Sequence, residues 1–220
     1  MIRDLDGPRL LPAAGGTPRC LVILVHGYGA DGNDLIALGK EWQHLIPDAA
    51  FAAPHAPEPC GGGGPGYQWF ELTMRDPHEL WHGVSKAGPG LDAFIDRECE
   101  RYALPAGRVA LVGFSQGTMM SLHVGLRRAE APAAILGYSG ALAGPEHLKG
   151  EVRARPPVLL IHGDRDELIP YQAMFLAGQA LAATDVPVEW HLSAGVGHGI
   201  DPKGLELGGH FLARALRGSK

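Results

Sequence analysis

The sequence predicts an α/β fold in which a mostly parallel central sheet carries helices on both faces. Three observations support it. Short apolar, β-branched runs alternate along the chain with longer segments whose apolar residues recur every three or four positions. The expected strands are continuous apolar runs, which suit a sheet covered on both faces. At 220 residues with 45% hydrophobic content, the chain suits one domain over residues 1–220 with a proper core.

Composition narrows the function classes. A net charge of −5 argues against a nucleic-acid partner. The three cysteines, Cys20, Cys60 and Cys99, have no metal-site spacing, so we expect reduced thiols. No apolar run precedes Leu21, and no apolar stretch is long enough to span a bilayer. We therefore expect a cytoplasmic protein without stable membrane insertion.

The N-terminal quarter is expected to begin irregularly and then form the first core strands. Prolines and glycines interrupt residues 1–19, leaving at most a short edge strand near Arg9–Leu11. Cys20–Val25 is an apolar run and reads as a buried strand. A helix should run from Asn33 or Asp34 to Leu45, followed by a strand over Ala49–Ala53.

A long connection rich in proline and glycine follows at residues 54–82. Connections of this length are usually functional or disordered, so residues 56–82 are a candidate lid segment over an otherwise minimal cap. The aromatic and apolar residues of Tyr67–Leu72 could form one wall of a substrate pocket. The alternative is a packed surface loop.

The rest of the chain continues the alternation. The expected elements are a helix over about Val84–Tyr102, a strand over Val109–Phe114, a helix to about Ala129, a strand over Ala133–Tyr138, a polar loop over Gly144–Arg155, a strand over Pro157–Ile161, a helix over Tyr171–Ala183, a strand over Val186–Leu192 and a helix from Lys203 or Gly204 to Leu216.

The strand over Val109–Phe114 leads into Gly113-Phe114-Ser115-Gln116-Gly117, a G-x-S-x-G motif between a strand and a helix. This context is typical of a nucleophile elbow, whose sharp turn lifts its serine above the sheet. Gly113 and Gly117 allow strand and helix to approach closely. Ser115 is the candidate nucleophile, and the N–H of Gln116, opening a helix, is a candidate oxyanion donor. The alternative is a helix-capping serine.

The first core strand ends in His26-Gly27-Tyr28-Gly29. An H-G-x-G loop here favours the N–H of Tyr28 as a second oxyanion donor. With Gly32, the loop also fits the dinucleotide motif G-x-G-x-x-G. That site would need an acidic residue closing the next strand, where Pro54 stands instead, so we reject it. A simple tight turn remains the alternative.

A serine nucleophile needs a base, and the base needs a carboxylate to orient it. The motif order places the carboxylate after the strand ending near Ile161, with Asp164, Asp166 and Glu167 as candidates. Asp164 directly follows a glycine and suits tying the turn together. Asp166 lies farther into the loop, from where its side chain can reach a histidine.

The base should follow the last strand. His198 stands there between two glycines, so its ring can project freely. His210 lies inside the last helix and is the weaker candidate. His26 and His162 lie at strand ends and read as structural.

His78-Glu79-Leu80-Trp81-His82 matches the zinc-protease motif H-E-x-x-H. Pro77 and Gly83 bracket a segment that we expect to be short, whereas a zinc helix normally continues. A third ligand would have to come from Glu98 or Glu100. We therefore prefer two unligated histidines and no metal, and keep a zinc hydrolase as the alternative function.

These motifs together resemble the carboxylesterase/acyl-protein thioesterase family, also called the phospholipase/carboxylesterase family, of α/β-hydrolases. The matching segments are His26–Gly29, Trp69-Phe70, Gly113–Gly117, His162–Pro170 and Gly197-His198. The resemblance implies the α/β-hydrolase fold and cleavage of carboxylic esters and thioesters without metal or cofactor.

The resemblance also implies roles for individual residues. It makes Ser115 the nucleophile, Asp166 the acid and His198 the base, with oxyanion donors on Tyr28 and Gln116. The expected substrate-contacting residues are Trp69, Leu72, Met119, Leu168 and Ile169, for which core packing is the alternative. Members of this family are often dimers, so the resemblance leaves both a monomer and a homodimer open.

Two questions stay open in the sequence. Short-chain esters, lysophospholipids and acylated protein cysteines all remain candidate substrates. A non-catalytic ligand-binding homologue on the same scaffold is the second rival to a serine hydrolase.

Overall fold

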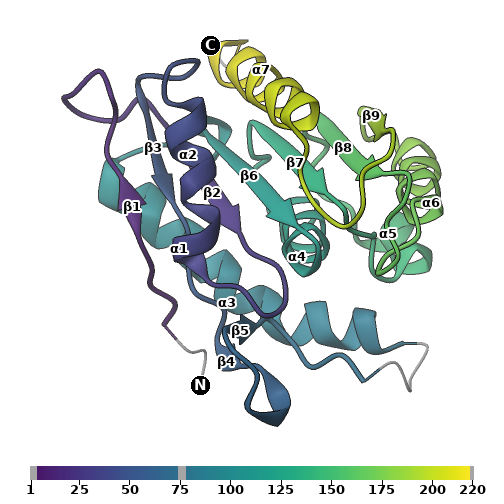
Figure 1. Cartoon of the computed structure of the whole chain (residues 1–220). Coiled ribbons are helices and arrows are strands. Elements are labelled where there is room, and N and C mark those ends of the chain that lie inside the picture. The colour runs from purple at the N-terminus through teal and green to yellow at the C-terminus, as the bar shows by residue number, and fades with distance from the viewer. Residues whose placement is uncertain (1–3, 74–77, 219–220) are drawn as a thin grey trace.

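A seven-stranded sheet forms the centre of the computed structural model, which describes residues 4–73 and 78–218 (Figure 1). Its order within the described residues is β1-β3-β2-β6-β7-β8-β9, and every neighbouring pair is parallel except β1 with β3. The strands are β1 (Arg9–Leu10), β2 (Cys20–Val25), β3 (Ala49–Ala52), β6 (Val109–Phe114), β7 (Ala134–Tyr138), β8 (Val158–Gly163) and β9 (Val188–Ser193).

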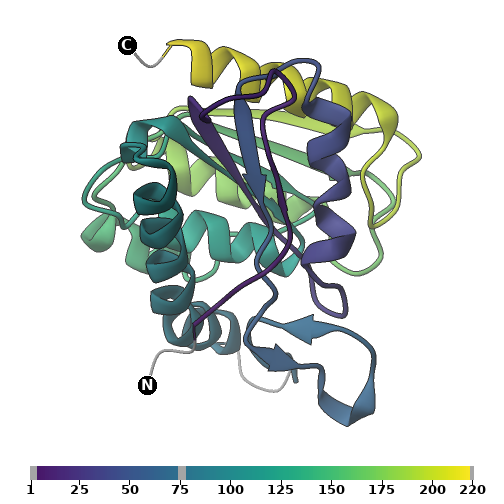
Figure 2. The ribbon, with the colours of Figure 1, turned by 90° about the vertical axis from the view of Figure 1, so that its left-hand side faces the viewer.

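Helices cover both faces of this sheet (Figures 1 and 2). The helices are α1 (Gly32–Leu35), α2 (Ala37–Trp42), α3 (Glu79–Tyr102), α4 (Gln116–Gly125), α5 (Pro145–Glu151), α6 (Gln172–Ala182) and α7 (Pro202–Gly218). Buried side chains of α3, α4, α5 and α6 share one core cluster, and those of α1, α2 and α7 share the other. The predicted α/β-hydrolase fold is confirmed.

The central strands are buried on both faces because their side chains alternate between the two cores. In β2, for example, Leu21, Ile23 and Val25 join the α3–α4 side, whereas Val22 and Leu24 join the α7 side. This explains why the strands read as continuous apolar runs in the sequence. Parallel strands also bring their C-terminal ends to one edge, where loops can meet.

The helix expected from residue 33 to Leu45 is instead two short helices, α1 and α2, that meet at Ile36. Asp31 caps the first one, its carboxylate accepting the N–H groups of Asn33 and Asp34. The N–H of Gly39 then bonds to the carbonyl of Ile36, only three residues back. This tighter turn interrupts the α-helical ladder.

Residues 54–82 are more ordered than the sequence indicates. They contain a hairpin of β4 (Glu58–Pro59) and β5 (Tyr67–Gln68), and α3 begins at Glu79 rather than near Val84. Residues 74–77, within the candidate lid, lie outside the described residues.

The prediction of a polar loop over Gly144–Arg155 is wrong, because helix α5 forms there. Pro145 occupies its first turn, where a missing N–H costs nothing. Leu148 is fully buried in the core beneath it. A single apolar anchor in a polar segment is too weak a pattern to predict a helix.

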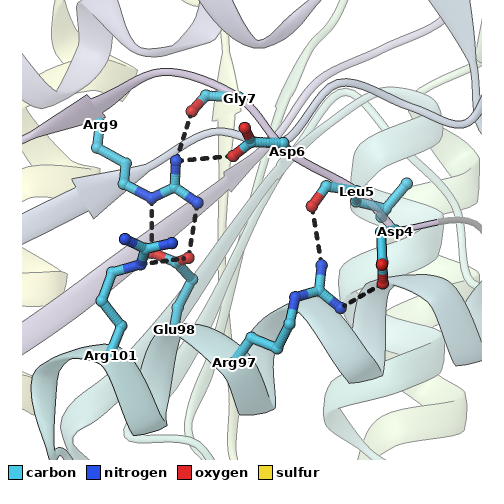
Figure 3. Close-up of polar contacts among 8 residues, drawn as sticks. All are labelled: Asp4, Leu5, Asp6, Gly7, Arg9, Arg97, Glu98 and Arg101. Carbon is cyan, nitrogen blue, oxygen red and sulfur yellow. Dashed lines mark hydrogen bonds and ion pairs between the residues drawn. The ribbon is translucent and has the colours of Figure 1, made fainter.

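The N-terminal segment is tied to α3 by buried charge (Figure 3). Both carboxylate oxygens of Glu98 accept hydrogen bonds from Arg9, at 2.8 and 2.7 Å, and Arg101 adds a third at 3.1 Å. Nearby, Arg97 donates to the carbonyl of Leu5 at 2.8 Å.

Among the described residues, no helix combines the length and apolarity that a bilayer crossing requires.

Candidate active site

The site begins at the end of β6, where Ser115 joins the strand to α4. Its backbone has φ 54° and ψ −117°, a strained conformation for a residue with a Cβ atom. The turn is held from both sides. The N–H of Ser115 donates to the carbonyl of Tyr138 at 2.9 Å, and the hydroxyl of Thr118, with its single hydrogen, lies within hydrogen-bond distance of the carbonyls of both Gly113 and Tyr138.

Two glycines make this turn sterically feasible, as the sequence predicts. A Cβ atom on Gly117 would lie 1.8 Å from the carbonyl oxygen of Val25. One on Gly113 would lie 2.4 Å from the carbonyl oxygen of Gly117. Helix α4 can therefore approach β2 and β6 only because these side chains are missing.

The loops after β8 and β9 bring Asp166 and His198 together. Nδ1 of His198 lies 2.7 Å from Oδ2 of Asp166. Because a carboxylate only accepts, Nδ1 carries the hydrogen, which leaves Nε2 of a neutral ring with a free lone pair. The ring of His198 also lies 5.0 Å, centroid to centroid, from that of Phe114, the residue preceding Ser115.

Asp166 is 8% exposed, and its carboxylate is saturated with donors. Oδ1 accepts the N–H groups of Leu168 and Ile169, both at 2.9 Å. Nε2 of His162 lies 3.1 Å from Oδ2, although its hydrogen-bond partner is the carbonyl of Ile169 at 2.8 Å. Burial would raise the pKa of Asp166, but the hydrogen bonds from Ile169, His198 and Leu168 outweigh burial and hold the pKa below its usual range.

The other acidic candidates lie elsewhere in the same loop. Oδ1 of Asp164 accepts the N–H of Gly195 at 2.6 Å, which ties this loop to the one carrying His198. Glu167 is exposed. His210, the weaker base candidate, lies on α7 with its side chain 61% exposed, 4.0 Å from Glu206.

The His26–Gly29 loop lies directly against Ser115. A Cβ atom on Gly27 would be 3.2 Å from the Cβ atom of Ser115. Within the described chain, the N–H groups of Tyr28 and Gln116 donate to no other residue, whereas that of Gly29 donates to the carbonyl of Tyr67. Two unused N–H donors therefore flank the candidate nucleophile.

This strand–elbow–helix arrangement matches known proteins along nearly the whole chain. The family model described as phospholipase/carboxylesterase matches residues 13–216. The chain belongs to this family. It is therefore a hydrolase of the carboxylesterase and thioesterase class.

Individual members of the phospholipase/carboxylesterase family support this assignment. Acyl-protein thioesterase 1 of Gibberella zeae is 28% identical, with 95% of each chain covered. Esterase YpfH of Escherichia coli is 24% identical, covering 91% of this chain and 88% of YpfH.

Solved structures agree with the sequence relatives. The structure of esterase PE8 has 42% identity and a TM-score of 0.93, covering 97% of this chain and all of PE8. SOBER1 of Arabidopsis thaliana, at 22% identity and a TM-score of 0.81 over 90% of this chain and 99% of its own, shares the fold.

The residues expected to contact substrate differ widely in exposure. Trp69 and Met119 are 1% and 4% exposed, so both are core residues in this structure. Leu72 and Ile169 are half-buried, and Leu168 is 73% exposed beside Asp166. Of the five, these last three have surface available to a ligand.

The H-E-x-x-H segment, His78–His82, lies at the start of a long helix instead of in the short segment that we expected. His78 precedes a helix that continues for 24 residues, so the expected short segment is wrong. The rings of His78 and His82 lie 6.2 Å apart, but nowhere in residues 4–73 and 78–218 do three His, Cys, Asp or Glu side chains gather as a metal site would require. Glu98, one suggested third ligand, is engaged by Arg9 and Arg101.

Three neighbours of the site escaped the sequence argument: the ring of Phe114, the imidazole of His162 and the side-chain amide of Gln116. Phe114 and Gln116 act through contacts distant in sequence, with the His198 ring and with the backbone of residues 69–70, so no local pattern signals them. His162 contacts Asp166 only four residues along the chain, within the motif segment His162–Pro170.

Proposed function

We propose that this chain hydrolyses carboxylic esters, and also thioesters, through an acyl-enzyme on Ser115. The observation that carries the proposal is the 2.7 Å contact of His198 with Asp166, together with the packing of the His198 ring on Phe114 next to Ser115. A buried, ionised carboxylate that orients a histidine beside a strained serine is the arrangement that activates a hydroxyl.

In the proposed first half-reaction, Nε2 of His198 takes the proton of Ser115 as Oγ attacks the carbonyl carbon. The resulting imidazolium is stabilised by Asp166. The N–H groups of Tyr28 and Gln116 bind the oxyanion of the tetrahedral intermediate. The carbon–oxygen or carbon–sulfur bond to the leaving group then breaks, and His198 returns the proton to the departing alkoxide or thiolate.

The second half-reaction repeats these steps with water. His198 removes a proton from water, and the hydroxide attacks the acyl carbon of the ester on Ser115. Collapse of the second tetrahedral intermediate releases the carboxylic acid, and Oγ recovers its proton from His198. No step needs a group that this chain does not carry.

The sequence identity to esterase PE8 is higher than that to acyl-protein thioesterase 1 of Gibberella zeae, so carboxylic esters are the substrates that we would test first. Thioesters enter as the second class because of those thioesterase relatives.

The test is intact-protein mass after incubation with a fluorophosphonate, with and without a chelator, and with Ser115→Ala as control. We expect one adduct on the wild type, unaffected by the chelator and absent from the variant. A folded wild type without an adduct, or an adduct that persists on Ser115→Ala, would refute the proposal. Loss of ester hydrolysis on chelation would favour the zinc alternative.

A further inference from the structure

Residues 56–70, part of the candidate lid, are hydrogen-bonded to the side chain of Gln116 and to the loop that carries Tyr28, but not to the two candidate oxyanion N–H groups themselves. The link to α4 is the side chain of Gln116, which is 1% exposed. Its Oε1 accepts the N–H of Trp69 at 2.9 Å, and its Nε2 donates to the carbonyl of Phe70 at 2.8 Å. Both polar atoms of the Gln116 side chain are therefore bonded to this backbone.

A second link runs to the loop that carries Tyr28. The indole N–H of Trp69 donates to the carbonyl of His26 at 2.9 Å. The His26 ring continues the chain of bonds. Its Nδ1 lies 2.7 Å from the carbonyl oxygen of Gly27, and its Nε2 accepts the N–H of Ala56 at 2.9 Å.

These contacts determine the form of the His26 ring. A carbonyl only accepts, so Nδ1 carries the hydrogen, and Nε2 must be unprotonated to accept from Ala56. His26 is therefore neutral, and burial accordingly lowers its pKa.

The bond from His26 to Gly27 controls where the N–H of Tyr28 points. The carbonyl of Gly27 and the N–H of Tyr28 belong to one planar peptide unit, in which they point in opposite directions. Fixing the carbonyl therefore fixes the donor.

The same reasoning applies at the elbow. The carbonyl of Ser115 accepts the N–H of Thr118 at 2.9 Å, so the N–H of Gln116, in the same peptide unit, points out of the helix.

The hairpin anchors this arrangement from outside. The N–H of Gly29 donates to the carbonyl of Tyr67 at 3.0 Å, and the N–H of Tyr67 donates to the carbonyl of Ala30 at 2.9 Å. A Cβ atom on Gly66 would lie 2.2 Å from the carbonyl oxygen of Gly29, so the two loops are in direct contact. Phe70 is 2% exposed and packs against Gly83 of α3.

We propose that His26, Trp69 and the side chain of Gln116 are positioning residues that hold the two oxyanion donors in place, with residues 56–70 acting as a fixed clamp. This inference rests on the proposed function. It assigns Trp69 a role different from substrate contact, which agrees with its 1% exposure.

The clamp acts on the transition state rather than on substrate binding. Oxyanion donors gain most when charge develops on the carbonyl oxygen, and removal of one donor typically costs about 100- to 1000-fold in kcat. Loosening the clamp leaves both donors present but less well aligned. We expect a smaller loss, about 10- to 100-fold in kcat, with little change in KM.

The test compares Trp69→Phe with Trp42→Phe. Each substitution removes one indole N–H bond from a buried tryptophan to a backbone carbonyl. Trp42 is also 1% exposed, and its Nε1 donates to Leu205 at 3.0 Å, but it lies in the other core. Thermal unfolding of both variants measures the shared cost to stability.

The decisive readout is inhibition by a trifluoromethyl ketone and by the matching methyl ketone. Addition of Ser115 to the first ketone forms a hemiketal whose oxyanion occupies the proposed site, whereas the second binds largely unreacted. In Trp69→Phe we expect the Ki of the trifluoromethyl ketone to rise in step with the loss of kcat, while the Ki of the methyl ketone stays near the wild-type value. Trp42→Phe should change neither.

An unchanged trifluoromethyl ketone Ki in folded Trp69→Phe would overturn the inference, as would an equal rise for both ketones. Gln116→Met, which keeps the backbone N–H and removes the two hydrogen bonds of the Gln116 side chain to Trp69 and Phe70, provides the same comparison should Trp69→Phe unfold. A Ser115 adduct in the wild type combined with unchanged Trp69→Phe kinetics would reject the clamp alone. Activity in Ser115→Ala would reject the proposed function itself.

Discussion

Oδ2 of Asp166 accepts the Nδ1–H of His198 across two loops that are 32 residues apart in sequence. The backbone of the Asp166 loop holds Oδ1 at the same time. The carboxylate therefore cannot turn away from the histidine without losing hydrogen bonds to its own loop. This saturation explains how a nearly buried carboxylate stays ionised.

Asp166→Asn tests that relationship. The amide can present its NH₂ group to Nδ1, which favours the wrong tautomer of His198, and an imidazolium would lose its counter-charge. We expect kcat for a small ester to fall about 10⁴-fold with KM nearly unchanged. Glu167→Gln, an exposed neighbour in the same loop, is the matched control and should retain wild-type rates. A loss below about tenfold in Asp166→Asn would contradict the assignment.

The elbow makes a second prediction, about stability. Gly117→Ala would place a Cβ atom 1.8 Å from the carbonyl oxygen of Val25, so the backbone of α4 or β2 must shift. We expect a loss of more than about 3 kcal/mol in the free energy of unfolding, measured in urea. At Gly107, a Cβ atom would meet nothing within 4 Å, so Gly107→Ala should change stability by less than about 1 kcal/mol. Equal stabilities of the two variants would show that the elbow tolerates the added methyl group.

The ion-pair cluster of Figure 3 makes a third prediction. In Glu98→Gln, the bidentate partner of Arg9 loses its charge and one hydrogen-bond acceptor. The Glu98 side chain is only 1% exposed, so water cannot replace the lost acceptor. Arg9 and Arg101 retain contact with solvent, which reduces the cost. We expect a loss of about 1–3 kcal/mol in the free energy of unfolding.

The control for that variant is Glu189→Gln, which removes a surface pair with Arg214. Its carboxylate is 61% exposed, so the loss should stay below about 1 kcal/mol. The prediction fails if both variants unfold at the same urea concentration as the wild type.

The fourth prediction concerns pH. Burial and the nearby Arg127 lower the pKa of His123 to about 4, from 6.5. The unfolded chain therefore binds a proton at His123 before the native state does. The stability that this residue confers is present above pH 6.5 and is lost as the pH falls toward 4, by up to about 3 kcal/mol.

Urea unfolding of wild type and His123→Phe at pH 7.5, 6 and 5 measures that contribution. The variant should lose less stability between pH 7.5 and 5 than the wild type does. His44→Gln, at an exposed position, should follow the wild type. Parallel curves for the wild type and His123→Phe would show that His123 does not cause the dependence.

Features whose signals are local can be read from the order of the amino acids alone. Core strands such as Cys20–Val25 and Val109–Phe114 appear as predicted, because a strand buried on both faces must be apolar at every position. The elbow is equally readable, since Gly113 and Gly117 are required by steric contacts close to the turn. The family resemblance then followed from motifs at strand ends.

How these motifs meet depends on the packing of segments that lie far apart in the chain. No local pattern shows that Asp166, rather than Asp164, faces His198, because both lie in one loop and the choice depends on how the β9 loop packs against it. The burial of Trp69 likewise follows from bonds to Gln116 and His26, residues 47 and 43 positions away. Hydrogen bonds between distant segments leave no periodic trace in a sequence, whereas burial of a strand or helix face does.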